Sequence, residues 1–216
     1  MIRQDTISKV LLAVASMVTI FLATYQTTTV IIFPVILLVT GLSMEFLIER
    51  RHIEEDESID GKEQVNIIGY TILGIITLMV TGYFINWSFS IPTAATLFPE
   101  QATIVMSFSS YDTLAYSILI AVAEEQFFRG FITDGLLHAS NRIPLMNISP
   151  FFALMFSAVI FCAYQFARYG TQPSALVYVY IGGFILSFIS YRTKRLSPAM
   201  FAHTFNNAAS VLMGMI

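Results

Sequence analysis

Three ionisable side chains lie inside an apolar stretch of this sequence, "AVAEEQFFRG", residues 121–130. Adjacent glutamates, Glu124 and Glu125, are followed by Arg129. A charged side chain at the centre of a bilayer costs about 2.5 to 3.5 kcal/mol, so such groups need partners. On a helix, Glu125 and Arg129 can pair on one face because they are four residues apart, whereas Glu124 is rotated by about 100°. The pattern indicates one ion pair and one further carboxyl group.

This cluster can have either a chemical or a structural role. An intramembrane carboxyl group usually faces a cavity and serves catalysis or transport. Two carboxyl groups in different environments can divide acid–base work, with Glu124 as the general base and Glu125 held by Arg129. The structural alternative is a buried ion pair and a neutral glutamate that help helices to associate.

Two later segments carry polar side chains with the same four-residue spacing. The stretch "SPAMFAHTFNNA" contains His203 and Asn207, and "FCAYQFARYG" contains Phe161 and Gln165. A histidine alone in an apolar helix is more often structural than catalytic. Together with the glutamates, however, His203 and Asn207 could donate hydrogen bonds to a developing oxyanion. Gln165 could equally be a hydrogen-bonding contact between helices.

The composition predicts an integral membrane protein. Of the 216 residues, 56% are hydrophobic and 12% are charged, and the mean hydropathy is +0.73. The net charge is -3, and no run of basic residues with interleaved aromatics is present, which argues against a nucleic-acid partner. Cys162 is the single cysteine, which excludes a disulfide framework and a thiolate metal cluster within this sequence.

About 20 apolar residues cross a bilayer once. On this measure the sequence predicts an all-α polytopic bundle of about seven transmembrane helices, near residues 7–25, 29–48, 65–87, 113–139, 150–167, 175–191 and 197–216. We expect a single membrane domain with two parts. Residues 1–112 would hold three helices and an acidic cytoplasmic loop at 49–64, and residues 113–216 would form a four-helix catalytic core.

Basic residues predict the orientation, because they are enriched on the cytoplasmic side of membranes. With the N-terminus in the cytoplasm, the inside set comprises nine residues: Arg3, Lys9, Arg50, Arg51, Lys62, Arg142, Arg192, Lys194 and Arg195. Arg168 alone falls outside. We therefore expect an integral protein of a prokaryotic cell membrane with a cytoplasmic N-terminus.

The polar residues of the last four spans resemble the signature motifs of the CAAX protease and bacteriocin-processing family, the glutamate intramembrane proteases related to type II CAAX prenyl endopeptidases. The first motif, E-E-x-x-x-R, is met by Glu124, Glu125 and Arg129. The third, H-x-x-x-N, is met by His203 and Asn207. The resemblance covers about residues 113–209.

The second motif of that family is F-x-x-x-H, and here the chain departs from it. Phe161 stands at the first position, but Gln165 replaces the histidine. The glutamine amide can hydrogen-bond a water molecule, yet it cannot carry a proton near neutral pH. A positioned proton carrier typically contributes about 10²- to 10⁴-fold to a rate. The resemblance thus implies an enzyme whose second motif has lost one function of the histidine.

By resemblance, Glu124 activates water, Glu125 and Arg129 orient the site, and His203 with Asn207 stabilises the oxyanion. The implied reaction is hydrolysis of a peptide bond in a prenylated CaaX-type or other membrane-associated peptide, with lipid and a lipidated or transmembrane peptide as partners. The alternative is a catalytically impaired relative that binds a membrane peptide or partner. A proton-coupled carrier would use the same carboxyl groups as a relay.

No cofactor is expected. No H-E-x-x-H motif is present, although zinc held by Glu124, Glu125 and His203 is conceivable.

The predicted topology raises a difficulty. In simple antiparallel crossings, Gln165 comes late in one span and His203 early in another, so the two would lie towards opposite faces of the membrane. They can share a site only if the helices are tilted or broken.

Overall fold

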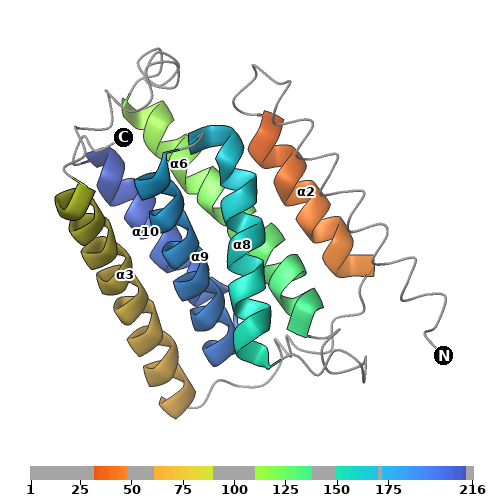
Figure 1. Ribbon diagram of the computed structural model, residues 1–216. Helices are drawn as coiled ribbons and strands as arrows, with labels where there is room; N and C mark the ends of the chain where they lie inside the picture. The colour runs from red at the N-terminus through yellow and green to blue at the C-terminus, as the bar shows by residue number, and fades with distance from the viewer. Residues whose placement is uncertain (1–31, 48–60, 90–109, 138–148, 170–171, 213–216) are drawn as a thin grey trace.

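The computed structural model describes residues 32–47, 61–89, 110–137, 149–169 and 172–212. Within these ranges the chain is helical and contains no strand, which confirms the predicted all-α class. The elements are α2 (Ile32–Leu47), α3 (Gly61–Phe89), α6 (Ser110–Glu125), η1 (Gln126–Thr133), α8 (Pro150–Tyr169), α9 (Pro173–Thr193) and α10 (Ser197–Leu212) (Figure 1). The predicted span 7–25 and most of the predicted acidic loop, residues 49–60, lie outside the described residues, as do Arg3, Lys9, Arg50, Arg51 and Arg142.

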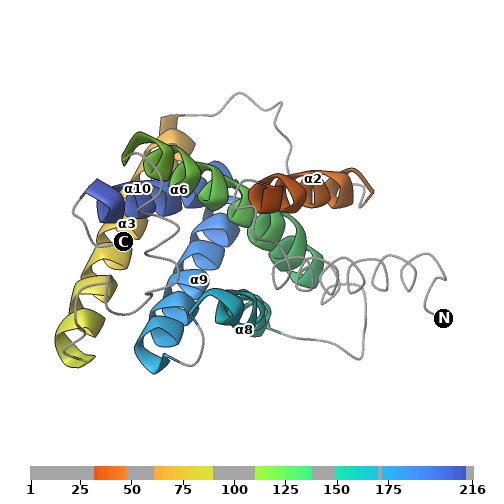
Figure 2. The ribbon, with the colours of Figure 1, turned by 90° about the horizontal axis from the view of Figure 1, so that it is seen from above.

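The helices cross one another. In Figure 1, α3, α10, α9 and α8 stand next to one another, and α6 passes behind them. From above, α6 and α10 lie side by side along their length, while α8 is seen much more nearly end-on (Figure 2). The α6–α10 pair is therefore strongly tilted against α8, and this tilt is what brings the polar residues of the different helices together.

Helix α3 begins four residues before the predicted span, at Gly61. Its first turn carries Glu63, and an acidic side chain near a helix N-terminus is favoured by the helix dipole. Glu63 also pairs with Arg195, with 2.9 Å between Oε1 and Nε. These contacts explain why a polar stretch that reads as the end of a loop is helical.

Two helices, α3 and α9, are long and apolar enough to cross a membrane, by length and composition alone. Much of α3 faces outward with large apolar side chains that are exposed: Val65, Ile68, Ile72, Ile76, Val80 and Phe84. An apolar surface of this extent is characteristic of contact with lipid or another protein rather than water.

Two buried apolar clusters hold the bundle together. The first surrounds η1 and includes Phe127, Phe128 and Phe131 with residues of α2, α6, α8 and α9. The second joins α3, α9 and α10 through Leu78, Leu186, Ile189, Ala199 and Ala202. The candidate site lies between the two clusters.

The fourth predicted span is not one continuous α-helix. It changes at Gln126 into the π-helix η1, in which every residue is buried. The Thr133 hydroxyl donates to the carbonyl oxygen of Phe128, five residues earlier, at 2.9 Å, and lies 2.6 Å from the Ser157 hydroxyl. Side chains from α8 thus support the widened turn, and π-helical turns are found frequently at functional sites.

Candidate active site

The ion pair predicted within the fourth span is present at the start of η1. Arg129 Nη1 lies 2.9 Å from Glu125 Oε1, and both side chains are almost fully buried. Arg129 Nη2 donates to the carbonyl oxygen of Gly183 at 3.1 Å, and the guanidinium carbon lies 4.4 Å from the centre of the Phe161 ring. The arginine is held from three sides, so the carboxylate of Glu125 is fixed as well.

Glu125 in turn holds His203. The imidazole Nδ1 lies 2.7 Å from Glu125 Oε1, the same oxygen that Arg129 contacts. A carboxylate beside an arginine accepts hydrogen bonds, which places a proton on Nδ1 of His203. The ring also meets Phe161 edge-on, with 6.4 Å between the ring centres. Glu125 and Phe161 therefore orient the histidine so that Nε2 faces the remaining glutamate.

Glu124 receives contacts from two further helices. Gln165 Nε2 donates to Glu124 Oε1 at 2.8 Å, and the Tyr164 hydroxyl donates to the same oxygen at 3.4 Å. The other oxygen, Oε2, lies 3.7 Å from His203 Nε2, too long for a direct hydrogen bond. One oxygen of Glu124 is thus anchored by α8, and the other faces the histidine of α10.

Gln165 and His203 consequently share one site, despite the difficulty raised by the predicted topology. Both contact Glu124, at 2.8 and 3.7 Å. The physical reason is the tilt of α6 and α10 against α8, which lets a late residue of one helix meet an early residue of the other (Figure 2).

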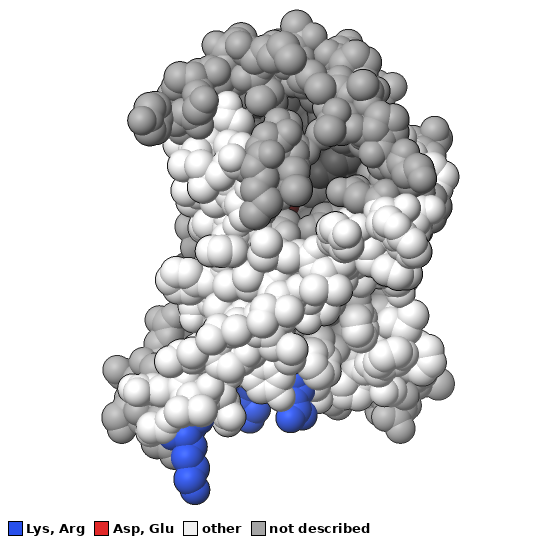
Figure 3. Space-filling model, turned by 90° about the vertical axis from the view of Figure 1, so that its left-hand side faces the viewer, with Lys and Arg blue, Asp and Glu red and all other residues white. Residues whose placement is uncertain are grey.

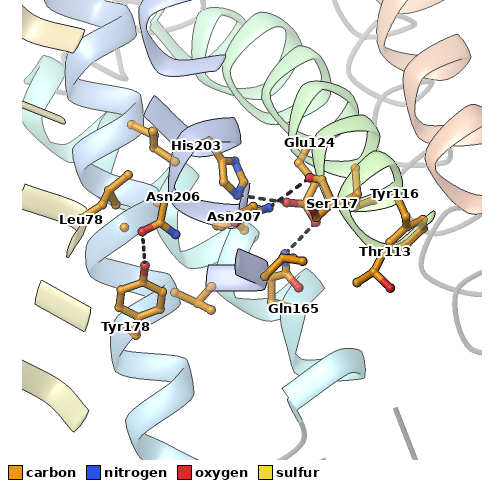
Figure 4. Close-up of a pocket in the computed structure, with 17 residues that line it drawn as sticks. Leu78, Thr113, Tyr116, Ser117, Glu124, Gln165, Tyr178, His203, Asn206 and Asn207 are labelled. Atoms are coloured by element: carbon orange, nitrogen blue, oxygen red, sulfur yellow. Dashed lines mark hydrogen bonds and ion pairs between the residues drawn. The ribbon is translucent and has the colours of Figure 1, made fainter. Parts of the chain in front are cut away.

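A cavity of about 100 Å³ borders these side chains (Figure 4). One water molecule needs at least about 10–15 Å³ measured in this way, so the cavity holds several. Glu124, Gln165, His203 and Asn207 all contribute to its wall. Four polar side chains therefore face one cavity that has room for water.

Residues 106–209 match the family of type II CAAX prenyl endopeptidases described as Rce1-like. Over these residues, just under half of the chain, the sequence is similar to the Rce1-like family. The match covers the whole of α6, η1, α8 and α9 and most of α10, and it confirms the resemblance drawn from the sequence motifs. Searches of curated proteins and of solved structures gave no match.

Similarity to the Rce1-like family implies protease activity of the CAAX type at the level of that family. Proteins of this family are embedded in membranes, in agreement with the two apolar helices α3 and α9. Helices α2 and α3 precede the matched residues.

Asn207, the last residue of the third motif, stands one turn beyond His203 on α10. Its Nδ2 donates to the carbonyl oxygen of Ser117 on α6 at 3.4 Å, a long hydrogen bond. The amide therefore borders the cavity and is only weakly held. Its assignment as an oxyanion donor stays a prediction.

Sequence reasoning missed several residues of this Rce1-like site. Tyr164 contacts Glu124, and Tyr178 donates to Asn206 Oδ1 at 3.1 Å on the cavity wall. Both asparagines of the "NN" pair in α10 line the cavity, a signal that was available in the sequence. The sequence did not indicate that the carbonyl oxygen of Gly183 would accept a hydrogen bond from Arg129. Every residue has a backbone carbonyl, and only packing determines which one lies near the arginine. A Cβ at Gly183 would lie 3.0 Å from the Phe161 ring, so this close approach leaves little room for a larger residue.

The zinc alternative rested on Glu124, Glu125 and His203. The structure brings the three side chains together, but it shows contacts among them and with Arg129. Within the described part of the chain, no group of three or more His, Cys, Asp and Glu side chains is placed to hold one ion.

Arg129→Met is expected to destabilise the protein by about 3–5 kcal/mol, because it leaves Glu125 buried without its cationic partner. Methionine keeps an unbranched apolar side chain against Phe161 and removes only the charge. Unfolding in mixed detergent micelles, followed by circular dichroism, measures the change in the free energy of unfolding. Lys62→Met, at an exposed position of α3, is the matched control and should change it little. Equal free energies for the two variants would contradict the structural importance of the pair.

Proposed function

We propose that this protein is an intramembrane endopeptidase that hydrolyses a peptide bond of a prenylated CaaX-type or other membrane-associated peptide, with water activated by Glu124. One observation carries the proposal. Glu124 is buried, one of its oxygens is anchored by Gln165, and the other lies 3.7 Å from His203 Nε2 beside a cavity. A water molecule in the adjoining cavity can approach both atoms of this pair and hydrogen-bond with them.

The proposed reaction begins when Glu124 takes a proton from that water, and the oxygen of the water forms a bond to the carbonyl carbon of the substrate. The negative charge that develops on the carbonyl oxygen would be stabilised by His203 Nε2–H and Asn207 Nδ2–H. Glu124 then returns the proton to the nitrogen of the leaving amine as the C–N bond breaks. The products are a carboxylic acid and an amine, which then exchange a proton to become a carboxylate and an ammonium ion, so atoms and charge balance.

The charges of the site support this division of roles. Glu124, Glu125, Arg129 and His203 are close together and buried. In its doubly protonated form, His203 together with Arg129 would balance the two carboxylates. It would then donate through Nδ1 to Glu125 and still have Nε2–H available for the oxyanion.

Gln165 would act in this reaction as an anchor rather than as a proton carrier. Its amide donates to Glu124 Oε1 at 2.8 Å, which leaves Oε2 directed towards His203. A glutamine can fix a carboxylate in this way, but it cannot exchange protons with water or with the leaving group. We therefore expect turnover that is slower than with a histidine at this position.

The second candidate function, a catalytically impaired relative that binds a membrane peptide or partner, is favoured by the same glutamine. The two candidates differ in whether the native chain cleaves anything. Purified protein in liposomes should cut members of a panel of lipidated and transmembrane peptides at a defined bond, as seen by mass spectrometry. If neither the native protein nor Gln165→His cuts any peptide, while a photo-crosslinkable peptide is still captured, the binding function is the correct one.

We further propose the arrangement in the membrane. Helices α6–η1, α8, α9 and α10 would form the four-helix catalytic core of a bundle of about seven transmembrane helices in a prokaryotic cell membrane, with the N-terminus in the cytoplasm. The support is the match at residues 106–209, the apolar faces of the helices and the position of the basic residues.

We propose that the hydrolysis needs no metal ion, because the side chains that could bind one are paired with each other. Prolonged treatment with a strong chelator, followed by removal of the chelator complex, should change the rate of peptide cleavage by less than about twofold. A zinc site at Glu124, Glu125 and His203 predicts instead that cleavage is lost and returns when zinc is added.

A further inference from the structure

The cavity next to Glu124 extends towards one end of the bundle. On α6 its wall runs from Glu124 back through Ile120 and Ser117 to Thr113, and on α10 it runs from His203 forward to Val211. At 1.5 Å per residue, the α6 stripe is about 16 Å long. Helix α6 begins and helix α10 ends at the upper end in Figure 1, so both stripes lead upward.

On the other two helices of the core, the wall of the cavity leads towards the same end of the bundle. On α8 the wall runs from Phe161 to Gln165, towards the C-terminal end of the helix, and on α9 it runs from Leu186 back to Tyr178, towards the N-terminal end. Helix α8 ends and α9 begins at the same upper end (Figure 1). Four helices therefore line a path that leads from the glutamates to one end of the bundle.

The opposite direction is closed. Below the cavity, Leu186 and Ile189 of α9 pack against Ala199 and Ala202 of α10, and all four are nearly inaccessible, with at most 2% of their surface exposed. Helix α3 approaches this cluster so closely that a Cβ at Gly74 would collide with the Ile189 side chain. No path is lined in that direction among the described residues.

Four of the basic residues that the structure describes lie beyond this closed end. Lys62 is in the first turn of α3, and Arg192, Lys194 and Arg195 belong to the end of α9 and the short connection to α10. Figure 3 shows blue Lys and Arg atoms at the lower end of the molecule. By its place near the end of α8, Arg168 is the exception to this grouping. Lysine and arginine are enriched on the cytoplasmic side of membrane proteins.

The outer part of the path is polar but uncharged. Beyond Glu124, Gln165 and His203, its polar lining consists of Thr113, Tyr116, Ser117, Tyr178, Asn206 and Asn207 (Figure 4). Such a lining can hydrogen-bond a peptide backbone, but it contains no partner for a charged side chain, and an unpaired charge in a buried path is costly.

From these observations we propose that the site is open to the outer side of the membrane, away from the cytoplasm, and takes uncharged peptide segments presented from that side. This inference rests on the proposed endopeptidase function for its substrate, but the direction of the opening can be tested without any activity.

Cysteine labelling tests the direction of the opening. In full-length protein with Cys162→Ser, Thr113→Cys marks the upper end of the path and Lys62→Cys marks the basic end. In right-side-out vesicles of a bacterial host, a charged, membrane-impermeant methanethiosulfonate should label Thr113→Cys at least about tenfold faster than Lys62→Cys, and inverted vesicles should reverse this order. The proposal is overturned if Thr113→Cys reacts only in inverted vesicles or in neither preparation.

Peptide cleavage in the same vesicles tests the substrate. A water-soluble, membrane-impermeant peptide that the purified protein cleaves should be cut in right-side-out vesicles and not in sealed inverted ones. Introducing aspartate next to the cleaved bond should lower kcat/KM by at least about tenfold. Cleavage in inverted vesicles alone overturns the proposal. If the purified protein cleaves no peptide at all, the endopeptidase function fails, and the labelling result still decides the direction of the opening.

Discussion

Glu124→Gln is expected to lower kcat for peptide hydrolysis by about 10²- to 10⁴-fold, the contribution of a positioned general base. The amide has nearly the same size and shape as the carboxylate, and its oxygen can still accept the hydrogen bond that Gln165 now donates to Oε1 at 2.8 Å. What it loses is the ability to take a proton from water. The rate is measured with the peptide cleaved most rapidly in liposomes, under single-turnover conditions.

The matched control for this variant is Glu63→Gln. Glu63 is also a helical glutamate with a cationic partner, Arg195 at 2.9 Å, but its side chain is 41% exposed and lies far from the cavity. An exposed ion pair contributes little to stability, so this variant should keep nearly the full rate. Binding of a crosslinkable peptide should be similar in both variants. A Glu124→Gln protein that retains more than about a third of the native rate would exclude Glu124 as the base.

Gln165→His should raise kcat by about 10²-fold, the low end of the range for general acid–base groups. The Nε2 atom of a histidine and the Nε2 atom of glutamine lie at similar distances from the backbone, so the imidazole can keep the hydrogen bond to Glu124. Unlike the amide, it can also take up and release a proton near neutral pH. The increase should appear in kcat rather than in KM, because the substitution adds a proton carrier and no new surface for the peptide.

Gln165→Met separates proton transfer from anchoring. Methionine has a similar volume but no donor, so Glu124 Oε1 would keep only the longer contact with Tyr164, at 3.4 Å. A buried acceptor that loses its main donor costs about 1–3 kcal/mol, and the rate should fall below that of the native protein. If neither histidine nor methionine at position 165 changes the rate, the residue does not take part in holding or activating water.

Much of the site follows from local spacing. Glu125 and Arg129 are four residues apart, so a helix brings them together whatever surrounds it, and the 2.9 Å contact was predictable. The same reasoning placed His203 and Asn207 on one side of the last helix, where both line the cavity. The apolar runs predicted the helices because a bilayer-length segment has few alternatives.

Other features depend on contacts between distant parts of the chain. The π-helix over Gln126–Thr133 is supported by hydroxyl groups of α8 and α9, which local sequence does not reveal. The early start of α3 involves Arg195, more than a hundred residues away. The carbonyl oxygen of Gly183 can accept a hydrogen bond from Arg129 only because α9 packs closely against η1.

The sequence by itself determined that the chain is an all-helical, apolar protein with the motif residues of the Rce1-like family, since these properties reside in composition and in spacing along one helix. Only the tertiary structure decided that Gln165 contacts Glu124 and that His203 lies between the two glutamates. The direction of the cavity, away from the end of the bundle with Lys62, Arg192, Lys194 and Arg195, was also decided only by the tertiary structure. Each of these depends on the angle at which two helices cross, which is set by packing over their whole length rather than by any single residue.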